Sequence, residues 1–228
     1  MEENDFEQFP EDIGIVETPK QFHQLGILVL DGSGSMQEQA QGGLTKANAV
    51  NDAVRELFTR FKVSRVKQNF SFAVVAFDNT ATLVTAPTEA AAIDDNGNYD
   101  PLSVKGGGTC IFEGLELSEK MANDFLENET DGGVYHSVVI LVMTDGMCFD
   151  PSKTTSSAEN IKNGSNGGKI TICTTYFGKI GESNAPAKEL LKKVATDPVM
   201  GFKEVYDAET LRSFFEKSIS AASGVNID

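Results

Sequence analysis

The sequence predicts an α/β fold with a central, mostly parallel sheet of about six strands, one of them antiparallel, and helices on both faces. Three observations support this prediction. Continuous apolar runs of strand length recur along the chain. These runs lack the polar alternation of strands with one wet face, so the strands should be buried on both sides. Between them, apolar residues recur at steps of three and four, which is the spacing of one helix face.

The first half of the chain predicts a strand, a helix and a hairpin. Residues 25–30 form the first apolar run, and apolar residues over 44–61 have helical spacing. Residues 70–77 predict a second strand. The polar pair at 78–79 is too short for a crossover, so the strand expected over 80–85 should pair with the second strand in the antiparallel sense.

The second half continues the alternation of helices and strands. The predicted helices span residues 111–126, 154–162, 187–195 and 211–219. The predicted strands span residues 137–143, 169–177 and 203–206. Because helices separate most of the strands, most of the sheet should be parallel and covered on both faces.

Residues 1–22 differ in composition from the rest of the chain. They contain seven acidic residues and one basic residue, and Pro10 and Pro19 would interrupt a helix. We expect an acidic N-terminal extension over residues 1–22, followed by one folded domain over residues 23–228.

Charge and cysteine content limit the classes of partner and the compartment. The chain carries 34 acidic and 19 basic residues, a formal net charge of −15. Such a surface repels phosphate, so we expect neither nucleic acid nor an anionic membrane as a partner. No apolar stretch approaches the roughly 18 residues of a membrane span, and the acidic N-terminus lacks the pattern of a secretion signal. The three cysteines (Cys110, Cys148 and Cys173) form no paired motif, so we expect a reducing, cytoplasmic location.

Two predicted buried strands are followed at once by an acidic residue. Asp31 ends the first run, and Asp145 comes one threonine after the run at 137–143. A carboxylate next to a buried strand is unfavourable unless it meets a cation or hydrogen-bond donors. Because the carboxyl ends of parallel strands share one edge of the sheet, the two acids should lie close together there. A bound metal ion would explain both.

The residues after Asp31 support a metal site. The segment Asp-Gly-Ser-Gly-Ser at 31–35 places Ser33 and Ser35 at alternate positions, and its glycines let the backbone curl so that the oxygens converge. Thr109, after the glycine run 106–108, offers one more hydroxyl. All these ligand atoms are hard oxygens, which suit Mg²⁺, Mn²⁺ or Ca²⁺ and not a thiolate zinc site.

These three parts resemble the metal-ion-dependent adhesion site of von Willebrand factor A domains. The segment 31–35, Thr109 and the Thr-Asp-Gly at 144–146 follow in that family's order, about 75 and then about 35 residues apart, each at a predicted strand end or glycine loop. The resemblance covers roughly residues 23–223 and implies a Rossmann-like three-layer fold.

The resemblance also implies a role for each site residue. Ser33 and Ser35 would bind the cation directly through their hydroxyls, and Thr109 directly or through water. Asp31 and Asp145 would act mainly through water and orient the serines. The cation expected is Mg²⁺, with Mn²⁺ or Ca²⁺ as alternatives.

The resemblance implies a binding function. A cation held mainly by neutral hydroxyls stays electrophilic and seeks an outside anionic oxygen, here a Glu or Asp of a partner protein. Stand-alone intracellular members resemble the tellurium-resistance-associated group, which implies a kinase, a phosphatase or an AAA-type ATPase as partner. We therefore expect a cytoplasmic adaptor.

Two alternatives remain open at the sequence level: a Mg²⁺-dependent hydrolase such as a phosphatase, and a structural subunit whose metal only orders loops. We do not expect an enzyme, because the residues of hydrolysis are missing from the motifs. Ser33 and Ser35 lack the frame of a nucleophile elbow, and Asp31 has no second acid two residues on. His23 and His136 start two predicted strands and should lie at the opposite end from the metal site.

Overall fold

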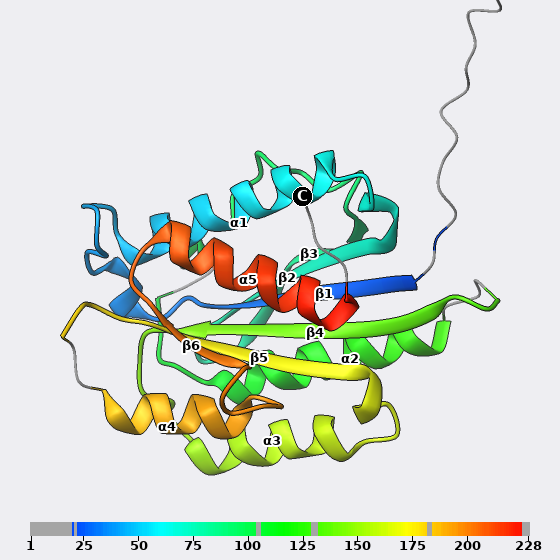
Figure 1. Cartoon of the computed structure of the whole chain (residues 1–228). Helices are drawn as coiled ribbons and strands as arrows, with labels where there is room; N and C mark the ends of the chain where they lie inside the picture. Colours follow the sequence, from blue (N-terminus) through cyan, green and yellow to red (C-terminus); the bar gives the residue numbers. More distant parts are fainter. Residues whose placement is uncertain (1–19, 21, 104–105, 129–131, 182–183, 225–228) are drawn as a thin grey trace, which may run out of the picture.

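The computed structural model describes residues 20, 22–103, 106–128, 132–181 and 184–224 (Figure 1). Its centre is a six-stranded sheet with the order β3-β2-β1-β4-β5-β6. Only β3 runs antiparallel to its neighbour, and the other strand pairs are parallel. The strands are β1 (Phe22–Asp31), β2 (Phe70–Phe77), β3 (Ala81–Glu89), β4 (Tyr135–Thr144), β5 (Ile170–Phe177) and β6 (Phe202–Val205).

Helices cover both faces of this sheet, as the alternation of elements predicts. One face carries α1 (Lys46–Val63) and α5 (Ala208–Ser223), which lie above the sheet in Figure 1. The other carries α2 (Ile111–Asn128), α3 (Pro151–Asn163) and α4 (Ala185–Val194). The three-layer α/β architecture is therefore confirmed.

The central strands are continuous apolar runs because both of their faces are buried. In β1, Leu28 and Leu30 belong to the core under α1 and α5, whereas Ile27 and Val29 belong to the core over α2, α3 and α4. Side chains of a strand alternate between the two faces, so one run supplies both cores.

Most predicted elements begin or end a few residues away from the predicted bounds, and two of these differences have a clear local cause. The first helix begins at Lys46 and not near Leu44, which lies in the preceding loop with 43% of its surface exposed. The Thr45 side chain caps the helix by accepting a hydrogen bond from the Asn48 backbone N–H, and this cap fixes the start. The antiparallel strand β3 continues past residue 85 to Glu89, because an edge strand tolerates the proline at position 87.

The topology defines which end of the sheet holds the polar residues. His23 and His136 pair in register at the starts of β1 and β4. Asp31 is the last residue of β1 and therefore lies at the opposite end of the strands. The acidic extension expected over residues 1–22 lies almost entirely outside the described residues; β1 begins at Phe22. Within the described part of the chain, none of the helices has the length and apolar character needed to cross a membrane.

Candidate metal centre

The strand order reverses between β1 and β4, and the predicted site lies there. From β1 the chain passes to β2 on one side through α1, and the later strands add on the other side of β1. In parallel α/β sheets such a reversal opens a crevice outside the carboxyl ends of the two central strands. Asp31 ends β1 and Asp145 directly follows β4, so both carboxylates stand in this crevice.

Asp31 is fully buried, and both oxygens of its carboxylate accept hydrogen bonds from neighbouring residues. One carboxylate oxygen, Oδ1, accepts a hydrogen bond of 2.7 Å from the Ser33 backbone N–H, and Oδ2 accepts one from the Thr144 hydroxyl. Burial raises the pKa of Asp31 from 3.8 to about 6, and the negative charge of Asp145 adds to the rise, while the bonds from Thr144 and Ser33 oppose it. A nearby cation would relieve this cost.

The loop after β1 brings two hydroxyls together. Gly32 is needed for this path, because a Cβ at this position would lie 2.6 Å from the Pro101 carbonyl oxygen. Ser35 lies in a short 3₁₀ turn, Gly34–Gln37. Its Oγ is 3.0 Å from Ser33 Oγ and donates a hydrogen bond of 2.6 Å to Asp145 Oδ1. Both serines are thereby tied to the end of β4.

Thr109 flanks this cluster from the loop before α2. Its loop is held by a backbone bond from Gly34 N–H to the Gly107 carbonyl at 3.2 Å, and by a bond from Gly108 N–H to the side-chain oxygen Oδ1 of Asn79 at 3.0 Å. A Cβ placed on Gly146 would lie 3.5 Å from Thr109 Oγ1 and 3.9 Å from Ser35 Oγ. Gly146 therefore leaves a space between these two hydroxyls that any side chain would fill. The Thr109 carbonyl in turn accepts the Phe149 N–H at 2.8 Å, which ties the loop after β4 to the loop before α2.

The donor set fits a hard divalent cation. Two ligands at neighbouring corners of a Mg²⁺ octahedron, each about 2.1 Å from the metal, are about 3 Å apart. The oxygens of Ser33 and Ser35 are separated by 3.0 Å. Of the candidate ligands, three are neutral hydroxyls, and the two carboxylates already accept hydrogen bonds from Ser33 and Ser35. Such a set suits Mg²⁺ or Mn²⁺ better than zinc.

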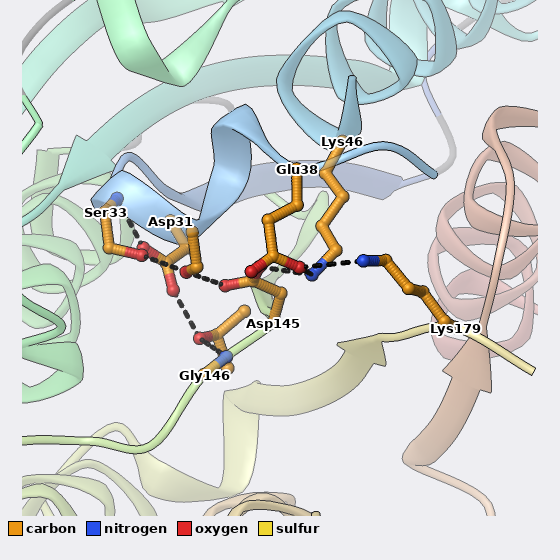
Figure 2. Close-up of polar contacts among 9 residues, drawn as sticks. Asp31, Ser33, Glu38, Lys46, Asp145, Gly146 and Lys179 are labelled. Carbon is orange, nitrogen blue, oxygen red and sulfur yellow. Dashed lines mark hydrogen bonds and ion pairs between the residues drawn. The ribbon is translucent and has the colours of Figure 1, made fainter. Parts of the chain in front are cut away.

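The structure adds residues that sequence reasoning did not assign a role in the site, among them three charged ones: Lys46, Glu38 and Lys179. Thr144 and Asn79 hold the cluster through the bonds given above. Lys46, the first residue of α1, places its Nζ 2.7 Å from Asp145 Oδ2 and 3.4 Å from Glu38 Oε2, and Lys179 also reaches Glu38 Oε2 at 3.0 Å (Figure 2).

A signal for Lys46 was present in the sequence. It stands four and seven residues before the core residues Val50 and Ala53, on the buried face of the helix. A lysine on such a face requires a partner.

The comparison with family models agrees with the motif. The model described as von Willebrand factor type A domain matches residues 27–147, which is more than half of the chain and runs from the middle of β1 to the loop after β4. The chain belongs to this family. Domains of this family commonly mediate protein–protein interaction or adhesion.

Solved structures share the fold at low sequence identity. The pilus adhesin SpaC from Lactobacillus rhamnosus GG is 12% identical, with a TM-score of 0.68 over 90% of this chain and 31% of its own. The von Willebrand domain of the type V pili tip protein Mfa5 from Porphyromonas gingivalis is 13% identical, with a TM-score of 0.63 over 91% and 98%. Proximal thread matrix protein 1 from the mussel byssus, in a structure with a zinc-occupied adhesion-site motif, is 18% identical, with a TM-score of 0.59 over 89% and 46%.

These likenesses support the fold alone. The chain spans about a third of SpaC, so that protein's other regions have no counterpart here. No curated protein sequence matches the chain.

Proposed function

We propose that this von Willebrand A domain is a divalent-cation-dependent protein-interaction module that takes an acidic residue of its partner as the final ligand. Ser33, Ser35 and Thr109 would hold the cation, Mg²⁺ first, and Asp31 and Asp145 would orient them. The observation that carries the proposal is the pair of serine oxygens 3.0 Å apart, beside carboxylates that already accept hydrogen bonds from the protein. The bound cation would supply an electrophilic centre for an outside carboxylate.

The hydrogen bonding of the carboxylates explains why a cation in this site would still bind an outside carboxylate. Asp31 has both oxygens engaged by Ser33 and Thr144, and Asp145 has both engaged by Ser35 and Lys46. Their charge therefore acts at a distance, and neutral hydroxyls make the direct contacts. A metal with few anionic ligands keeps its demand for another one.

The surroundings of the site favour a protein as the source of that ligand. Three large apolar side chains are exposed on loops at this edge of the sheet: Met147 at 51%, Phe149 at 85% and Ile180 at 71%. Phe149 is joined to Thr109 through the backbone, and Ile180 follows Lys179, which pairs with Glu38. Apolar and aromatic side chains around a polar centre are typical of protein interfaces and are not needed to bind a small anion.

One further methionine does not contribute to this surface. Met36 lies beside the serines in sequence, but it is fully buried in the core under α1. The exposed rim therefore comes from the loops after β4 and β5.

An intracellular adaptor role is the finer part of the proposal. It is supported by three cysteines that are all buried and form no disulfide with one another. The resemblance to stand-alone intracellular members makes kinases, phosphatases and AAA-type ATPases the first partner classes to test. Because pilus proteins are among the structural neighbours, the location has to be measured directly by fractionation of the native cell.

Calorimetric titration of the chelator-stripped protein with Mg²⁺ tests the metal site. We expect saturable binding to the wild-type chain, loss of binding when Ser33 and Ser35 are both replaced by alanine, and no change in Ser165→Ala, which removes an exposed hydroxyl elsewhere. Equal affinity of the double variant would contradict the proposal.

Partner capture in Mg²⁺ and in EDTA then separates the two metal roles. Capture that disappears in EDTA supports the interaction module. Capture that persists while EDTA lowers the melting temperature would instead favour a metal that only orders loops.

A further inference from the structure

Lys46 is a buried cation inside the candidate metal centre. Its side chain is 2% exposed, and Nζ contacts Asp145 Oδ2 at 2.7 Å and Glu38 Oε2 at 3.4 Å. The Asp145 side chain is itself 0% exposed, whereas that of Glu38 is 51% exposed. The ammonium therefore interacts most closely with the carboxylate that lies next to the serines.

The backbone fixes this lysine in place. Lys46 N–H donates to the Glu38 carbonyl at 2.8 Å, and Gln39 and Thr45 form an isolated antiparallel bridge that closes the loop between them. Thr45 caps the helix that starts at Lys46. A buried charge is costly unless it is paired, so a helix start that directs a lysine inward needs a compensating partner, and Asp145 provides it.

The pairing decides what each oxygen of Asp145 does. Because Lys46 engages Oδ2, the other oxygen, Oδ1, is the one that accepts the Ser35 hydroxyl proton at 2.6 Å. A hydroxyl that donates its proton to a carboxylate turns its lone pairs the other way. The lone pairs of Ser35 Oγ therefore point away from Asp145 and are available to bind a cation beside Ser33 Oγ.

The same pairing sets the charge of the centre. Asp31 and Asp145 bring two negative charges, and Lys46 cancels one of them at close range. Glu38 is half exposed and is also paired with Lys179 on the solvent side, so it adds little to the balance. A divalent cation would therefore leave the centre with one surplus positive charge, which an outside carboxylate neutralises.

We propose that Lys46 is a positioning and specificity residue of the metal centre: it keeps Asp145 turned toward Ser35 and makes the loaded site anion-seeking. This inference rests on the proposed cation-dependent function. Lys46 acts through Asp145, whose Oδ2 lies 2.7 Å from its Nζ. Without it, Asp145 would be free to compensate the cation by itself, and the demand for a partner carboxylate would fall.

The test replaces Lys46 with methionine, whose unbranched side chain is one atom shorter and carries no charge. In chelator, Lys46→Met should melt at a lower temperature than the wild type, because Asp145 is left buried without its cation. We expect its Mg²⁺ affinity by calorimetry to rise by at least about tenfold, because one positive charge beside the metal is gone. Saturating Mg²⁺ should also raise its melting temperature more than that of the wild type.

A second readout measures the anion demand directly. Acetate is titrated into the Mn²⁺-loaded protein and followed by water-proton relaxation. The wild type should bind acetate at the metal, and Lys46→Met should bind it at least about tenfold more weakly. A residue with a merely structural role would lower stability without raising metal affinity.

Matched variants keep the outcomes distinct. Lys179→Met removes the same charge from the solvent side of Glu38 and should change neither affinity by more than about twofold. If Lys46→Met does not stay folded in chelator, Lys46→Gln serves as a second variant that also removes the charge. Unchanged or weaker Mg²⁺ binding by folded Lys46 variants overturns this inference alone, whereas a wild-type chain that binds no Mg²⁺ overturns the proposed function as well.

Discussion

Replacing Asp31 by asparagine should stabilise the metal-free protein at neutral pH while abolishing cation binding. The asparagine carbonyl can accept the Ser33 N–H as Oδ1 does, and its amide can donate to the Thr144 hydroxyl, so the hydrogen bonds survive in altered form. The buried negative charge is removed. The variant therefore isolates the cost of holding a carboxylate in this crevice.

The magnitude follows from the pKa of Asp31, which burial raises from 3.8 to about 6. A carboxyl whose pKa is raised by folding binds its proton more tightly in the folded state. Its ionisation destabilises the fold as the pH rises from 3.8 through 6, and the full cost is present above 6. The difference corresponds to about 3 kcal/mol, of which about 1.5 kcal/mol develops between pH 5 and pH 8.

Urea unfolding in EDTA measures this cost. The stability difference between Asp31→Asn and the wild type should grow in favour of the variant by about 1.5 kcal/mol from pH 5 to pH 8, a range that stays above the isoelectric point of about 4.5. In Mg²⁺ the wild type should recover stability and the variant should not. A difference that is the same at both pH values would refute the reasoning, because it would mean that Asp31 carries no buried charge.

Three further predictions concern the geometry around the site. Gly146→Ala should fold normally by circular dichroism but bind Mg²⁺ at least about tenfold more weakly, since its methyl group fills the space beside Thr109 Oγ1; undiminished binding would contradict the placement of the cation there. Gly32→Ala should cost about 2–3 kcal/mol in urea unfolding because of the 2.6 Å approach to the Pro101 carbonyl, whereas Gly34→Ala, whose nearest contact is 3.9 Å, should be nearly neutral. Burial raises the pKa of the Cys173 thiol, so at pH 8 this thiol should react with a thiol reagent much more slowly in the native protein than in urea, and equal rates would argue against its place in the core.

The fold could be predicted because its strands are buried on both faces. A run such as β2 (Phe70–Phe77) lacks polar alternation and is typical of a strand that is buried on both faces. Its bounds agree with the predicted residues 70–77. Most other bounds differ by a few residues, and two of these differences depend on single contacts: the Thr45 cap at the start of α1 and the edge position of β3. Neither contact leaves a periodic signal in the sequence.

The positions of the candidate ligands could also be predicted, since each follows a strand end or a glycine loop. The contacts that hold them could not be predicted: the helical spacing indicates that Lys46 needs a buried partner, but not which residue that partner is. Lys46 pairs with Asp145 across 99 positions of the chain, and the pairing depends on how the loop from Glu38 to Thr45 closes. Motif spacing fixes which oxygens converge, whereas the charges around them follow from tertiary packing.

The candidate centre is assembled from segments that lie far apart in the chain: the loop after β1, the loop before α2 and the loop after β4. None of these segments can offer the full set of oxygens until the sheet has formed, so an unfolded chain has no comparable affinity for the cation. If the Kd of the proposed site for Mg²⁺ is one hundredth of the ambient Mg²⁺ concentration, binding raises the free energy of unfolding by about 2.7 kcal/mol. The concentration of the ion around the protein would then govern how long each molecule survives proteolysis, as well as whether it engages its partner.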